Sequence, residues 1–236
     1  MKRIGSACMA AARPLWWKLL LTVAGLGAAE WVLFARVNDS MQCFGDLLQL
    51  AHFPKLFALS FGVMALFIIL QNSAFRNEKS GYTLRRLPIG EWTVTLLWAV
   101  IYFFCFVILW AAQLALIYGF WRMYCSAHTV LSPGLELFVE FYAEPFLHSL
   151  LPLADVTRWL RMLFWLPALS FGLAAFGFCH RRGKFRVEPL VLLVAGQGFW
   201  GTEMASIGVD IALMLLSAAL AGSSAYGMWR ISYEED

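Results

Sequence analysis

The sequence predicts an all-α protein that crosses a membrane about six times, and three observations lead to this fold class. Of the 236 residues, 61% are hydrophobic and only 14% are charged, whereas soluble domains carry about 45–50% apolar and about 25% charged residues. The apolar residues gather in long runs, and the basic residues are distributed unequally between the connections. A soluble fold of this size cannot bury so much apolar surface, so we expect lipid to cover part of it.

Three predicted spans occupy the first half of the chain, at residues 15–34, 56–75 and 92–121. A helix needs about 20 residues to cross about 30 Å of hydrocarbon. The third run would reach about 45 Å, so we expect it to tilt or to project beyond the bilayer. The charged start of the chain resembles a signal peptide, but the first run continues past Glu30, which favours an uncleaved span.

The second half carries predicted spans at residues 162–179, 189–202 and 211–229. The run at 189–202 is short for a crossing helix. We expect it to be one half of a broken hairpin that turns near residues 196–201 and continues into the last span. The last span is rich in small residues that let helices approach closely. The chain is therefore predicted to form one transmembrane domain, residues 1–236.

The distribution of lysine and arginine predicts the orientation. With the N-terminus inside, 13 of the 18 basic residues lie in inner segments, and the positive-inside rule then places both termini in the cytoplasm. An even number of spans agrees with this. The basic residues expected outside are Arg36, Lys55, Arg122, Arg158 and Arg161.

The outer segment, residues 124–161, is predicted to contain an amphipathic helix. Ser132 and Pro133 form a helix-start signal. Four polar residues follow at four-residue spacing, near one helix face: Glu136, Glu140, Glu144 and His148. This pattern fits a carboxylate–imidazole cation site, but it is more typical of the solvated face of a helix lying on the outer surface.

Polar residues within or beside the spans are the candidate pathway or packing residues. Charges inside a membrane are costly and by default indicate a transport pathway or a pairing. Glu30, Glu203 and Asp210 are expected near the outer interface, where this cost is small. The candidates are Glu30, Gln113, Glu203 and Asp210.

The chain shows no pattern typical of an enzyme. It lacks an acceptable nucleotide-binding P-loop, an H-E-x-x-H metal motif and a G-x-S-x-G nucleophile elbow. The five cysteines are scattered, so a zinc site is not expected. A net charge of +3 is too mild to indicate nucleic-acid binding. We therefore expect no catalytic residue, metal or cofactor in this chain, and in particular no ATPase of its own.

A resemblance to a known family begins at the connection between the second and third predicted spans. Residues 80–89 read SGYTLRRLPI. This run resembles the inner loop of bacterial ABC-2 type permease subunits, which carries a threonine, leucines and a Leu-Pro-Ile/Val turn at this place. Residues 146–153, FLHSLLPL, resemble an outer motif in one Gram-positive branch of the family. The long acidic outer segment departs from the family pattern and leaves substrate and subfamily open.

The resemblance implies a half-transporter of the bacterial cytoplasmic membrane. Such a permease subunit pairs with a second one, either the same chain or a paralogue, and works with separate cytoplasmic ABC ATPase subunits. The inner loop, here residues 77–91, is implied to form a coupling helix that docks on the ATPase. The residues that match this loop are Tyr82, Leu84, Arg85, Arg86, Leu87 and Pro88.

Three alternatives remain open from the sequence. The chain could be an integral membrane accessory or assembly subunit that transports nothing. It could also be a membrane enzyme, which would require activity from the purified chain alone. The basic inner loop could also anchor to anionic membrane lipid, at about 1 kcal/mol for each Lys or Arg.

Overall fold

The computed structural model describes residues 2–37, 43–74, 90–128, 132–153, 155–197, 200 and 207–235. All regular secondary structure in these ranges is helical. The helices are α1 (Lys2–Val37), α2 (Phe44–Leu50), α3 (Phe53–Ala74), α5 (Glu91–Ala127), α6 (Pro133–Ala143), α7 (Pro145–Leu150), α8 (Val156–Arg181), α9 (Glu188–Gln197) and α10 (Ile207–Glu235). Five of them are long and apolar enough to cross a membrane, namely α1, α3, α5, α8 and α10. The predicted all-α, multi-pass class is confirmed.

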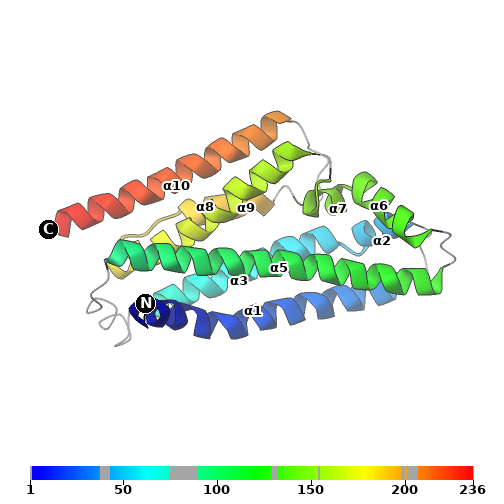
Figure 1. The fold of residues 1–236 in the computed structure, drawn as a ribbon, viewed down its shortest axis with the longest axis horizontal. Helices are drawn as coiled ribbons and strands as arrows, with labels where there is room; N and C mark the ends of the chain where they lie inside the picture. Colours follow the sequence, from blue (N-terminus) through cyan, green and yellow to red (C-terminus); the bar gives the residue numbers. More distant parts are fainter. Residues whose placement is uncertain are drawn as a thin grey trace.

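The five long helices lie side by side along the long axis of the molecule (Figure 1). The start of α1 and the end of α10 lie at the same end of this bundle, which we call the terminal end. The end of α3, the start of α5 and the end of α8 lie there too. The short helices α2, α6 and α7 lie at the opposite, distal end.

Helix α8 is the central element of the bundle. It packs against α3, α5, α9 and α10. Within its most apolar stretch 78% of the residues are buried, against 22% to 39% for the other four long helices. Small residues make this possible, because Gly172 contacts Pro189 of α9 and Gly177 contacts Asn72 of α3.

Aromatic side chains fill the middle of the core. The ring of Phe61 in α3 stacks on Phe106 of α5 at 5.2 Å and on Trp165 of α8 at 5.7 Å between centroids. Trp200 packs against the same group: its ring centroid lies 5.8 Å from that of Phe61 and 4.8 Å from that of Phe57. Such ring pairs contribute about 0.5–1.5 kcal/mol each beyond the area that they bury. They hold α3, α5 and α8 together near their midpoints.

The observed helices differ in length from the predicted spans. Helix α1 extends from Lys2 instead of residue 15. Helix α5 ends at Ala127 instead of residue 121, and its 37 residues reach about 55 Å, well beyond the bilayer core. Helix α9 has ten residues, too few to cross alone. The count of six crossings therefore stays a prediction, and half of the expected turn at 196–201 lies outside the described residues.

The outer segment corrects two expectations. The connection between α5 and α8 is shorter than the expected residues 124–161. Tyr124 belongs to α5, and Arg158 and Arg161 belong to α8. The single helix expected after Pro133 is two helices, since α6 ends at Ala143 and Glu144 is extended. Pro145 explains the break, because a proline disfavours the helical conformation of the residue before it.

Candidate functional site

Hydrogen bonds connect α3, α5 and α8 near the terminal end. Asn72, in the last turn of α3, donates to the carbonyl oxygen of Leu173 in α8 at 3.2 Å. The Tyr102 hydroxyl of α5 donates to Asn72 Oδ1 at 2.9 Å. Asn72 and Tyr102 are buried. A Cβ atom on Gly177 would lie 2.7 Å from Asn72 Cγ, so only glycine leaves room for this arrangement.

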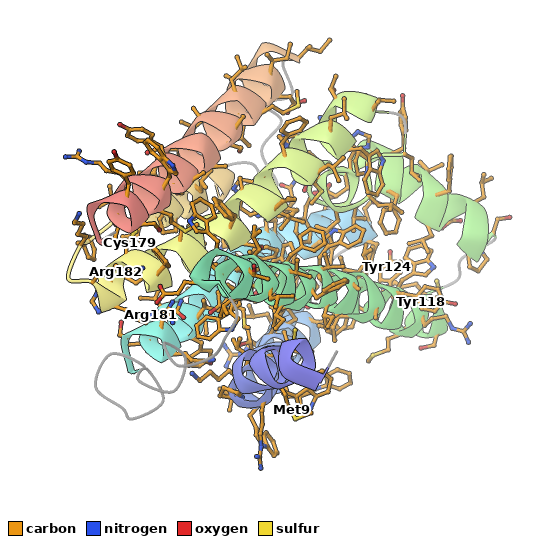
Figure 2. The ribbon with its side chains drawn as sticks, turned by 60° about the vertical axis from the view of Figure 1, so that its left-hand side comes forward. Met9, Tyr118, Tyr124, Cys179, Arg181 and Arg182 are labelled. Carbon is orange, nitrogen blue, oxygen red and sulfur yellow. The ribbon has the colours of Figure 1, made fainter. Side chains whose placement is uncertain are left out.

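An ion pair adds a second link between α5 and α8. Glu91, the first residue of α5, accepts a hydrogen bond from Arg182 Nη2 at 2.8 Å, and Arg182 follows the last residue of α8. The acidic group at a helix start and the basic group at a helix end both complement the helix dipoles. Arg181 lies over the ring of Trp98 at 5.3 Å. Figure 2 shows Arg181 and Arg182 at the terminal end, beside the start of α5.

The connection from α8 to α9 is bound to α10. Arg186 Nη1 lies 2.6 Å from Glu188 Oε1, and the Ser223 hydroxyl of α10 donates to the same carboxylate oxygen at 3.1 Å. The Arg186 guanidinium occupies the space beside Gly227, where any side chain would collide with it. We call the contacts of these three paragraphs the terminal junction; they join α3, α5, α8, α9 and α10.

A second polar pair lies inside the bundle, between α1 and α5. Gln113 Nε2 donates to Glu30 Oε1 at 2.7 Å, and both side chains are fully buried. Glu30 follows Leu15, Leu19, Thr22 and Leu26 on the inward face of α1. The Glu30 side chain therefore faces the interior of the bundle, and its expected position near the outer interface stays a prediction.

A third polar pair joins α8 to α10. Arg161 Nη1 lies 2.6 Å from Asp210 Oδ1, and the two side chains are 8% and 3% exposed. Arg161 was expected in an outer loop, but it lies in the second turn of α8. Beside the pair, Met162, Trp165 and Trp200 line a cavity of about 10 Å³, at the lower limit for one water molecule. Asp210 is thus a packing partner that the sequence did not match to Arg161.

The four polar residues at four-residue spacing in the outer segment make two separate sets of contacts at the distal end. They are Glu136, Glu140, Glu144 and His148. Gln49 of α2 donates to Glu144 Oε1 at 2.9 Å, and Glu140 accepts a hydrogen bond from the backbone N–H of Gly45. Burial raises the pKa of Glu140, the Gly45 hydrogen bond opposes this shift, and the neighbouring Asp46 adds to it. The solvated-face interpretation therefore holds only in part, because two of the carboxylates bind α2.

His148, the last of these four residues, contacts the start of α8. His148 Nε2 lies 3.0 Å from Asp155 Oδ2, and Arg158 Nε lies 3.2 Å from the same oxygen. The hydrogen bond with His148 holds the pKa of Asp155 below its usual value, and the charge of Arg158 adds to this effect against the opposing effect of burial. Within the described ranges, no three His, Cys, Asp or Glu residues are close enough together to hold a metal ion.

The remaining predicted site residues fall outside the described part of the chain. This applies to Glu203 and to all the candidate coupling residues: Tyr82, Leu84, Arg85, Arg86, Leu87 and Pro88. The structure does describe the residues on both sides of this loop, Asn72 to Ala74 and Gly90 to Trp92. The partners of these flanks are Tyr102, Leu173 and Arg182. They could not be predicted from the sequence, because each lies far from its partner along the chain.

The fold and its polar contacts define the class of the molecule, a helical membrane protein that crosses the bilayer several times. Comparisons with protein families, curated proteins and solved structures found no match for this chain. The particular function is therefore argued from the chain itself.

Proposed function

We propose that this chain is the membrane-spanning permease half of an ABC transporter. It would move a substrate across the bacterial cytoplasmic membrane with energy from ATP hydrolysed by a separate subunit. The resemblance of residues 80–89 to the inner loop of ABC-2 type permeases supports this proposal. The observation that carries it is the terminal junction, which binds both flanks of that loop to the central helix α8.

A transporter of this kind needs a mechanical connection from the loop into the membrane. A partner can shift this protein only through contacts whose free energy differs between two conformations. Asn72 lies in the last turn of α3, just before the loop, and Glu91 starts α5 just after it. Both contact α8, through Leu173 and Arg182 respectively. A displacement of the loop would therefore act on three long helices together.

The orientation follows the same proposal. The start of α1, the end of α10 and the connection from α8 to α9 share the terminal end, and that connection carries Arg182, Lys184 and Arg186. The positive-inside rule makes this end the cytoplasmic one, where an ATPase would dock. Glu30, Gln113 and Asp210 are buried within the helix bundle. We assign Asp210 a packing role, as the partner of Arg161, and none of the three a catalytic role.

Co-purification tests the proposal most directly. The chain is expressed with the ATPase encoded beside it and isolated in detergent through a tag on this chain alone. We expect the ATPase to co-purify and its hydrolysis rate to depend on this subunit. The double variant Leu84→Asp/Leu87→Asp should release the ATPase, whereas Arg85→Gln/Arg86→Gln should release much less.

Two results would contradict the coupling assignment. Unchanged ATPase binding in the Leu84/Leu87 variant would show that this loop does not form the contact. Isolation of the chain without any ATPase, in every condition that preserves its fold, would favour the accessory or assembly subunit instead. Release caused mainly by the arginine variant, together with loss of binding to anionic vesicles, would favour a lipid anchor.

A further inference from the structure

The pairing of Glu30 with Gln113 leaves two buried oxygen atoms without a partner in the described part of the chain. Gln113 uses its Nε2 to donate to Glu30 Oε1 at 2.7 Å. Glu30 Oε2 and Gln113 Oε1 are both buried and accept no hydrogen bond. A buried acceptor without a donor costs roughly 1–3 kcal/mol, and more when the group is charged. The site therefore lacks at least one hydrogen-bond donor.

The buried neighbours of the pair on α1 and α5 supply neither a donor nor a charge. The buried residues one turn away are Leu26 and Phe34 on α1, and Leu109 and Ile117 on α5. The helices are closely packed beside the pair, since a Cβ atom on Gly27 would lie 3.3 Å from Leu116 of α5. This packing keeps the two oxygen atoms away from lipid and from bulk water.

Near the distal end, the charged groups of the neighbouring elements lie at exposed positions, whereas the pair is buried. Helix α1 packs against α2, α3 and α5. The described charged residues nearest the distal end of these elements are all exposed: Arg36 on α1, Asp46 on α2, Lys55 on α3 and Arg122 on α5. None of them compensates a charge on Glu30. An ionised Glu30 would be a buried carboxylate with a single neutral donor, an arrangement that a membrane interior strongly disfavours.

We propose that Glu30 is a proton-binding site within the membrane, with Gln113 as the second half of the site. A proton on Oε2 turns that oxygen into a donor, which can bond to Gln113 Oε1. The carboxylic acid and the carboxamide then form two reciprocal hydrogen bonds, so one proton satisfies both atoms. In the reaction a carboxylate and a proton from water give the neutral acid, and no other reactant is needed.

A metal cation fits this site less well than a proton. Hard cations take about six or more oxygen ligands, whereas the pair offers three free or shared oxygen atoms. The Gln113 NH₂ group also points its positive end at Glu30 Oε1. The structure thus favours the smallest cation, which needs only one donor and one acceptor position. The inference is independent of the ATPase partner proposed above.

Infrared difference spectroscopy on the purified full-length chain tests the proposal at neutral pH. We expect wild-type protein to show the carbonyl stretch of a neutral carboxylic acid and the Glu30→Gln variant to lack it. Gln113→Leu should shift the band to higher frequency, because the carbonyl loses its hydrogen bond. Glu136→Gln, which removes an exposed carboxylate of α6, is the matched control and should leave the band unchanged.

Thermal unfolding in detergent gives a second, independent measurement. Glu30→Gln replaces the acid by a neutral amide that still donates and accepts, so its unfolding temperature should fall less than that of the wild type between neutral and alkaline pH. Wild-type protein should lose stability over the same range as Glu30 gives up its proton. Identical carbonyl spectra for wild type and Glu30→Gln would overturn the proposal. Loss of the wild-type band on replacing potassium by sodium would do so as well, because a metal would then occupy the site.

Discussion

Gly177 shows how a single residue sets the distance between two helices. The missing side chain gives Asn72 the room to reach the carbonyl oxygen of Leu173 while it accepts the Tyr102 hydroxyl. The sequence could not predict this role, because glycine is common in membrane helices and its contact lies 105 positions away along the chain. Only the folded structure brings the two residues together.

We expect Gly177→Ala to destabilise the protein by about 1–3 kcal/mol, the usual cost of adding volume to a packed core. The new methyl group would push Asn72 out of its hydrogen bonds. Gly222→Ala is the control, since a Cβ atom at Gly222 meets nothing within 4 Å. Thermal or denaturant unfolding in the same detergent compares the two variants. Equal stability of both would contradict the importance of this contact.

Asp155 offers a residue-scale prediction about pH. Its pKa is lowered in the fold, so its contribution to stability is present above its unfolded pKa of about 3.9 and is lost as the pH falls through the lower folded value. Wild-type protein should therefore lose stability relative to Asp155→Asn below about pH 4. The effect should be small, because the Asp155 side chain is 45% exposed. Unfolding midpoints of the two proteins, measured from neutral to acidic pH, test this. Parallel pH profiles would contradict it.

At the scale of helices, some features were predictable and others were not. The long apolar runs predicted four of the long helices with small errors, because hydrocarbon length constrains a span strongly. Pro145 could have predicted the helix break at Glu144, but the regular spacing of the glutamates suggested one continuous helix. The burial of Arg161 could not be predicted from the sequence, because its partner Asp210 belongs to another helix. Pairing between distant elements leaves no periodic signal in one sequence.

The ion pair between α8 and α10 yields a prediction at this scale. Breaking a buried pair leaves one charge behind, so Arg161→Met or Asp210→Leu alone should cost about 3–5 kcal/mol. The double variant should cost less than the sum of the two, because no charge remains buried. Arg158→Met is the control, whose half-exposed partner should limit the loss to about 1 kcal/mol. A double-mutant cycle of unfolding free energies measures the coupling, and strict additivity would contradict it.

The helix bundle is organised around its most buried long helix, α8. Helix α8 contacts four neighbours, whereas α1 and α10 lie at opposite edges of the bundle (Figure 1). Positive-inside counting agrees with this arrangement, since the start of α1 and the end of α10 share one end. The six-crossing count depends on how the chain passes from α9 to α10, and most of that passage lies outside the described residues.

Cysteine labelling tests the orientation of the whole bundle. In a background without the natural cysteines, Leu84→Cys should react with a membrane-impermeant maleimide only after the cells are opened. Phe138→Cys, on the exposed distal helix α6, should react in intact cells. The reverse labelling pattern would show that the protein has the opposite orientation in the membrane. Labelling of both positions from the same side would contradict the arrangement of the two ends.

The central position of α8 also has a consequence for biosynthesis. During translation α8 is made after α1, α3 and α5 but before α10, so Arg161 enters the membrane before Asp210 exists. Insertion of an arginine near the lipid carries a cost of a few kcal/mol, and this cost persists until the last helix arrives. A nascent chain that stops before α10 therefore lacks the carboxylate that pairs with Arg161 in the finished protein. The charge of Arg161 is thus compensated only once the last helix has been made and packed against α8.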